Sequence, residues 1–234
     1  MKKLIQFEPH EIEFEQDSLY PVPASKCIPK WYKDLSLWVD QDLKDFKIEN
    51  KTVKACPPFL DSLSSGYIYK LPVDVEFIKT SSGVDVRWLL PGDNVISNHN
   101  PRQFSKDGLS VCSFEGIFKW QFPFTIKTPP GYSVLFTHPL NRYDLPFLTL
   151  SGIVECDVYP ERINFPFQLL NFKEDRLLIE SGTPLVQMIP IKRDSWDHEK
   201  KPFVYGNKEK SFLQLKKMLH KSYKKQWWAK KEYQ

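Results

Sequence analysis

Glycine, cysteine and methionine are scarce in this 234-residue chain, with nine, four and three residues. Nineteen prolines against nine glycines favour stiff turns between short strands and argue against a helical bundle. No apolar run approaches the roughly 20 residues that span a bilayer. The opening MKKLIQFEPHEIEFEQ reaches acidic residues before a signal-peptide core can form, so we expect a cytoplasmic protein with no membrane contact.

Cysteine and histidine do not cluster at metal-ligand spacing. The chain has no CxxC pair, and its few residues of these types are scattered: Cys27, Cys56, Cys112, Cys156, His10, His99, His138, His198 and His220. A structural zinc site needs two close ligand pairs, so we predict no metal and free, mostly buried thiols.

The composition indicates one soluble folded unit with many rings to bury. Hydrophobic residues make up 41% and aromatic residues 15% of the chain, against 26% charged residues. The net charge of +4 is unevenly spread, because lysine and arginine outnumber the acids after Lys192.

Alternating or continuous apolar segments recur at short intervals, which is typical of strands. Residues 67–80 and 84–90 flank Ser81-Ser82-Gly83 and predict a hairpin with positive φ at Gly83. Further strands are expected at 131–139, 147–159, 163–172 and 185–193. Without intervening helices, they predict an all-β fold, a jelly-roll or β-clip-like antiparallel sandwich or barrel, over residues 56–194.

The two ends of the chain differ from this core. Residues 1–55 form a Pro-broken N-terminal arm that we expect to pack on the sheet, with Pro29 starting a short helix that carries Trp31 and Leu35. Residues 195–234 include apolar side chains at spacings of three and four, from Phe212 to Trp227, and predict a basic, amphipathic C-terminal helix. We expect the three parts to form one folded unit.

Residues 128–191 resemble the dUTPase and dCTP deaminase superfamily, whose members have β-clip or jelly-roll folds. Residues 152–155 (GIVE) match its Gly-Val-Ile-Asp pattern, and Gly182 with residues 186–188 (VQM) matches its Gly-x-x-x-Ala-Gln-Leu pattern. The resemblance implies a β-clip core. It also implies a nucleotide site with Glu155 as base, Gln187 in the pocket and Tyr159 near a stacking position.

The activity of that superfamily is less well matched. Its Ser-Gly phosphate turn would fall near residues 139–144 (PLNRYD), which hold neither serine nor glycine, and its Gly-rich C-terminal clamp is replaced by lysine and tryptophan. Glu155 stands where the family has aspartate, and Tyr159 lies one position late. Magnesium is expected only if the nucleotide hydrolase interpretation holds; otherwise no cofactor is predicted.

Longer blocks, including KWYKDL, ACPPFLDSLSSGYIYKLPVDVEF and GTPLVQMIPIKRDSW, resemble an uncharacterised family common in tailed marine phages and some bacteria. That resemblance implies a phage-type accessory protein in the host cytoplasm, with no assigned activity.

The acids Glu155 and Asp157 are candidate catalytic residues. Two residues apart on a strand, they would face the same way, and their charges could raise one pKa for proton transfer. The alternative is that both point to solvent, opposite Val154, Cys156 and Val158.

Polar residues elsewhere are candidate binding groups. Arg142, next to Asn141, could bind phosphate or form a loop salt bridge near His138 and Asp144. In the C-terminal helix, Lys216, Lys217, Lys224 and Lys225 could contact nucleic acid or form a solvated surface.

Two functions remain open. The first is a non-catalytic binding or assembly β-domain with a protein partner or self-association. The second is a divergent nucleotide hydrolase.

Overall fold

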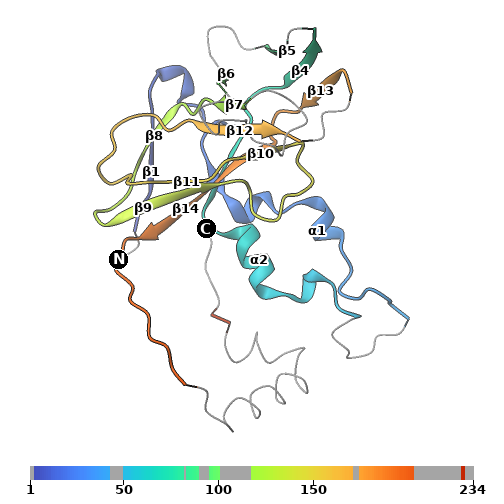
Figure 1. The fold of residues 1–234 in the computed structure, drawn as a ribbon, viewed down its shortest axis with the longest axis vertical. Helices are drawn as coiled ribbons and strands as arrows, with labels where there is room; N and C mark the ends of the chain where they lie inside the picture. The colour runs from blue at the N-terminus through green and yellow to red at the C-terminus, as the bar shows by residue number, and fades with distance from the viewer. Residues whose placement is uncertain are drawn as a thin grey trace.

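The computed structural model describes residues 3–42, 50–81, 83–89, 95–100, 117–170, 174–202 and 228–229. Antiparallel strands dominate these residues, and the all-β prediction is confirmed (Figure 1). The strands form four sheets and close no barrel within the described part of the chain.

The largest sheet has five strands in the order β11-β9-β14-β3-β2. Their bounds are β11 Gly152–Val154, β9 Tyr132–Thr137, β14 Pro184–Lys192, β3 Tyr67–Lys70 and β2 Val22–Pro23. The central strand β14 runs antiparallel to both neighbours, with Gln187 opposite Thr137 of β9 and Ile68 of β3. Position 187 therefore lies in the middle of the sheet.

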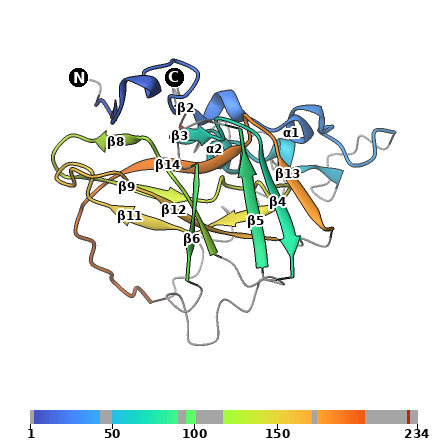
Figure 2. The same ribbon diagram turned by 90° about the horizontal axis from the view of Figure 1, so that it is seen from above.

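Three smaller sheets complete the fold. The four-stranded sheet follows the order β10 (Phe147–Thr149), β12 (Phe165–Leu169), β7 (Ile117–Trp120) and β6 (Ile96–His99). The three-stranded sheet comprises β13 (Arg176–Ile179), β4 (Val75–Thr80) and β5 (Gly83–Trp88), and Figure 2 shows it running across the direction of β9 and β14. The last two strands, β1 (Gln6–Pro9) and β8 (Phe124–Lys127), pair with each other.

The predicted hairpin at residues 67–90 is confirmed only in its second half. β4 and β5 pair around the turn, with Thr80 opposite Gly83, whose φ is 144°. Residues 71–74 break the expected first strand into β3 and β4. This break lets β3 join the five-stranded sheet and β4 join the three-stranded one.

A helix that the strand pattern did not predict lies inside the expected β core. Helix α2 spans Pro57–Ser64, and prolines occupy its first turn, where a missing N–H costs nothing. In the N-terminal arm, helix α1 (Lys30–Asp34) starts directly after Pro29, as predicted. Tyr32 of α1 stacks on Phe59 of α2 with ring centroids 5.8 Å apart. The arm also contains the short 3-10 turns η1 (Ile12–Phe14), η2 (Ala24–Cys27) and η4 (Val53–Ala55).

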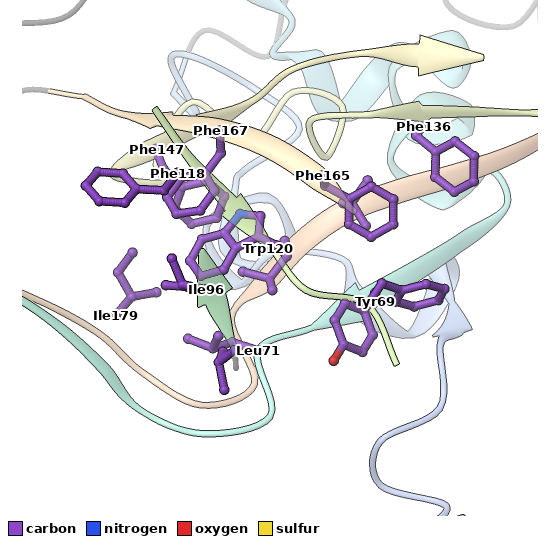
Figure 3. Close-up of a cluster of buried hydrophobic side chains, with 14 of the residues drawn as sticks. Tyr69, Leu71, Ile96, Phe118, Trp120, Phe136, Phe147, Phe165, Phe167 and Ile179 are labelled. Atoms are coloured by element: carbon purple, nitrogen blue, oxygen red, sulfur yellow. The ribbon is translucent and has the colours of Figure 1, made fainter. Parts of the chain in front are cut away.

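Aromatic side chains fill the core between the sheets (Figure 3). Trp120 of β7 is fully buried and stacks on Phe167 of β12, with ring centroids 3.8 Å apart. Phe147 and Phe77 meet the same Phe167 ring edge-on. Such aromatic pairs add about 0.5–1.5 kcal/mol each beyond their burial. The rings predicted from composition thus form one continuous core.

The C-terminal region is described only in part. Residues 195–202 are exposed and belong to no helix or strand. The predicted amphipathic helix otherwise falls outside the described residues, apart from 228–229. Among the helices that are described, none is long and apolar enough to cross a membrane.

Candidate functional site

Gln187 is the polar centre of the five-stranded sheet. Gln187 is 1% exposed. Its Oε1 accepts from the Leu140 N–H at 2.8 Å, and its Nε2 donates to the Ser62 carbonyl at 2.9 Å and the Ser65 carbonyl at 2.6 Å. One amide therefore joins β14, the loop after β9 and the end of α2.

Asn141 belongs to the same junction. Its backbone adopts the left-handed conformation, with φ of 59°, a region that asparagine tolerates better than most residues. Its Nδ2 donates to the Ser62 Oγ at 2.6 Å. The loop between β9 and β10 is thus joined to α2 in two ways, directly by the Asn141 side chain and through the Gln187 side chain.

Arg142 forms a bidentate ion pair with Asp144. Its Nε and Nη2 atoms donate to the two carboxylate oxygens at 2.8 Å each, and the arginine side chain is 13% exposed. Burial would raise the pKa of Asp144, but the hydrogen bonds and charge of Arg142 outweigh burial and lower it. Of the two roles considered for Arg142, the structure shows the loop salt bridge.

His138 begins the loop between β9 and β10 that also carries Arg142. Its Nδ1 accepts from the Thr149 N–H at 3.3 Å, and its Nε2 lies 3.0 Å from the Arg142 carbonyl oxygen. This pattern requires a neutral ring with its proton on Nε2. Burial lowers the pKa of His138, which also favours the neutral form.

Arg142 and Gln187 line one small cavity, together with Cys27 and Leu63. Its volume is about 10 Å³, room for a single water molecule. Burial raises the pKa of the Cys27 thiol, so this cysteine stays protonated and weakly nucleophilic. The cavity as it stands cannot enclose a nucleotide.

Asp157 is held by a second bidentate pair. Its oxygens accept from both Nη atoms of Arg193, just after β14, and from the Gly131 N–H at 2.8 Å. The Arg193 hydrogen bonds, followed by that of Gly131, lower the pKa of Asp157 to about 2. The Asp157 side chain is 5% exposed. It links the turn after β11 to the end of β14.

Glu155 and Asp157 do not lie on one strand, which corrects the expected shared strand face. Glu155 is exposed, as the solvent alternative expects, but Asp157 is not. The strand expected at 147–159 is split into β10 and β11, and it ends at Val154. Residues 156–158 form a turn in which the Glu155 carbonyl accepts from the N–H groups of Val158 and Tyr159. In this turn Glu155 and Val158 are exposed, whereas Cys156 is buried and Asp157 is ion-paired.

Three candidates therefore do not join the Gln187 junction. Glu155 and Tyr159 are exposed residues of the turn after β11 and do not line the cavity of Arg142 and Gln187. Asp157 pairs with Arg193 instead. Lys216, Lys217, Lys224 and Lys225 lie outside the described residues.

The prediction of free, mostly buried thiols holds only in part for the described cysteines. Cys27, Cys56 and Cys156 are free thiols, but Cys56 is exposed, and Cys112 falls outside the described ranges. Burial raises the pKa of Cys156 to about 11. The described residues bring together no three metal-ligating side chains.

Sequence reasoning missed Ser62, Ser65 and Arg193 as partners at these two junctions. Their partners lie 125, 122 and 36 residues away in the chain. No local pattern signals such pairs, although the adjacent prolines at 57 and 58 could have indicated the helix that carries Ser62.

Comparisons with known proteins give little further information. No protein-family model matches the chain, and no curated protein matches it. Among solved structures, the native dUTPase of EIAV aligns with a TM-score of 0.33 and 13% sequence identity, over 62% of this chain and 87% of that chain. At these values the comparison says nothing about what this chain does.

Proposed function

We propose that this chain is a non-catalytic binding or assembly domain, a phage-type accessory protein of the host cytoplasm. The observation that carries the proposal is the complete hydrogen bonding of Gln187 by Leu140, Ser62 and Ser65. In the alternative interpretation Gln187 belongs to a nucleotide pocket, where a free amide group could bind the ligand. Here its amide oxygen and both amide hydrogens are used by main-chain groups.

The other candidate site residues support the same conclusion. The Arg142 guanidinium is paired with Asp144. The Asp157 carboxylate accepts hydrogen bonds from Arg193 and Gly131. Bidentate pairs of this kind position loops, and breaking one to bind a substrate would cost free energy. These residues stabilise the fold.

Exposed segments offer surfaces for contact with a protein partner or a second copy. Residues 193–202 continue from β14 as an exposed, extended segment, seen in orange leaving the core in Figure 1. Trp196 in this segment is 90% exposed, and tryptophan is enriched among residues that dominate protein interfaces. Ile153 of β11 and Val158 in the turn after it are 58% and 75% exposed. β11 is the outer strand of its sheet among the described strands.

A thermal-shift screen against nucleoside triphosphates, with and without magnesium, tests the proposal. A ligand that binds only the folded state raises the melting temperature, so we expect no shift with any nucleotide. The alternative, a divergent nucleotide hydrolase with Glu155 as base and Arg142 on phosphate, predicts a shift that Arg142→Met abolishes. Lys192→Met, at an exposed ion pair, serves as the control.

The lysines of the C-terminal segment remain a proposed nucleic-acid contact. Fluorescence anisotropy with a labelled single-stranded oligonucleotide would test it, since binding by Lys216, Lys217, Lys224 and Lys225 should weaken steeply with salt. Their replacement by glutamine should abolish binding.

A further inference from the structure

The C-terminal part of the chain meets helix α2 at one described contact. The indole Nε1 of Trp228 donates to the Asp61 Oδ2 at 3.0 Å, across 167 positions of the sequence. Trp228 is half-buried there. Figure 1 shows the short coloured piece at residues 228–229 near α2. A hydrogen bond to a carboxylate is charge-assisted and stronger than one between neutral groups.

The backbone of the acceptor residue, Asp61, is held in place within helix α2. The Asp61 carbonyl accepts from the Ser65 Oγ at 2.6 Å, and the neighbouring Ser62 is bonded to Asn141 and Gln187. Helix α2 is therefore clamped to the core on the side of Gln187. A fixed helix backbone leaves only the Asp61 side chain to be ordered when the contact forms, which favours the contact.

Charge favours docking of this segment on its own molecule. Residues 203–234 contain nine lysines and two glutamates, a net charge of +7, so residues 1–202 carry −3 within the total of +4. A basic segment joined to an acidic body is attracted to it at ordinary ionic strength.

We propose that Trp228 is the anchor by which the lysine-rich C-terminal segment docks on helix α2 of the same molecule, with Asp61 as its acceptor. The bond between Trp228 and Asp61, here called the latch, ties the segment to α2 at this described contact. It lowers the apparent affinity of the segment for an external anion by the fraction of molecules that are latched. The docking of Trp228 does not depend on the proposed function, whereas its effect on anion binding rests on the proposed nucleic-acid contact of the lysines.

Limited trypsin digestion of the full-length protein tests the latch. Lys225, Lys230 and Lys231 flank Trp228, so mass spectrometry of the released C-terminal peptides reports how often the segment leaves α2. When opening is fast, cleavage follows the population of the open form. We expect Asp61→Ala and Trp228→Phe, which keeps a ring but removes the N–H, each to speed this cleavage about ten-fold, the size expected for one charge-assisted hydrogen bond.

Two controls keep the result interpretable. Asp85→Ala removes an exposed acid from β5 and should leave cleavage unchanged. Circular dichroism should show that Asp61→Ala is folded, and Trp228→Phe tests the same bond from the tail, away from the core. Equal cleavage of wild type and both latch variants would overturn the proposal. A cleavage rate that falls as protein concentration rises would also overturn it, because the segment would then dock on a second copy.

Discussion

Gln187 of β14 donates its amide N–H to the Ser65 carbonyl at the end of helix α2, at a distance of 2.6 Å. This bond fastens the helix to the middle of the largest sheet. The same side chain also bonds Ser62 and Leu140, so a single buried residue joins three segments.

Replacing Gln187 by methionine should destabilise the protein. Methionine has a similar shape but cannot bond the part-buried carbonyls of Ser62 and Ser65 or the Leu140 N–H, at a cost of about 2–4 kcal/mol in the free energy of unfolding. Urea denaturation measures this difference. Gln16→Met is the matched control, because Gln16 is exposed and its loss should change stability by less than about 0.5 kcal/mol. Equal stability of Gln187→Met and wild type would show that the junction contributes little.

Gly66 should not tolerate any side chain. Its φ is +69°, and a Cβ there would lie 2.1 Å from the Met188 carbonyl oxygen of β14. Gly66→Ala must therefore push β3 from β14, and we expect a loss above about 3 kcal/mol. Gly182→Ala is the control, since its φ is +83° but nothing lies within 4 Å of the new Cβ. That variant should cost only about 1–2 kcal/mol from backbone strain, measured in the same denaturation series.

The stability of the protein should fall below neutral pH because of His138. Burial lowers its pKa in the folded state below the ordinary value of 6.5, so the unfolded chain binds more protons as pH falls through 6.5. Stability is then complete above that value and declines beneath it, as protonated Nδ1 can no longer accept from Thr149. Melting temperatures between about pH 5 and about pH 7.5 measure the decline.

A histidine variant separates this effect from general acid sensitivity. In His138→Gln the slope of melting temperature against pH should become shallower over the same range. His198→Gln, at a histidine with an 86% exposed side chain, should keep the wild-type slope. An unchanged slope in His138→Gln would assign the pH dependence to other groups.

The ion pair of Asp157 and Arg193 should act at lower pH. Arg193 and then Gly131 hold the pKa of Asp157 at about 2 in the folded state, against an ordinary 3.8. This stabilisation is present above pH 3.8 and is lost as pH falls toward 2. Arg193→Met should lower the melting temperature at neutral pH, and the gap from wild type should close across this range. Lys192→Met, from an exposed pair, should show no such gap.

The amino-acid pattern was sufficient to predict where strands form but not where each strand ends. Period-two segments correctly predicted strands near β4, β5, β9, β12 and β14. The expected strand at 147–159 did not end where its apolar alternation ended, because Cys156 turns inward within a tight turn while Val158 turns outward. Alternation cannot distinguish a continuing strand from a turn that happens to keep the same polarity.

By itself, the sequence determined that the chain builds an aromatic, antiparallel β core with a short helix after Pro29, because these features follow from local side-chain periodicity and proline geometry. Only the tertiary structure decided what the polar residues do. Gln187, Arg142 and Asp157 resemble site residues in sequence. Gln187 and Asp157 are hydrogen-bonded by residues of distant segments. Arg142 is paired with Asp144 in its own loop. The packing of the sheets on α2 creates those distant pairings, and no local pattern encodes them.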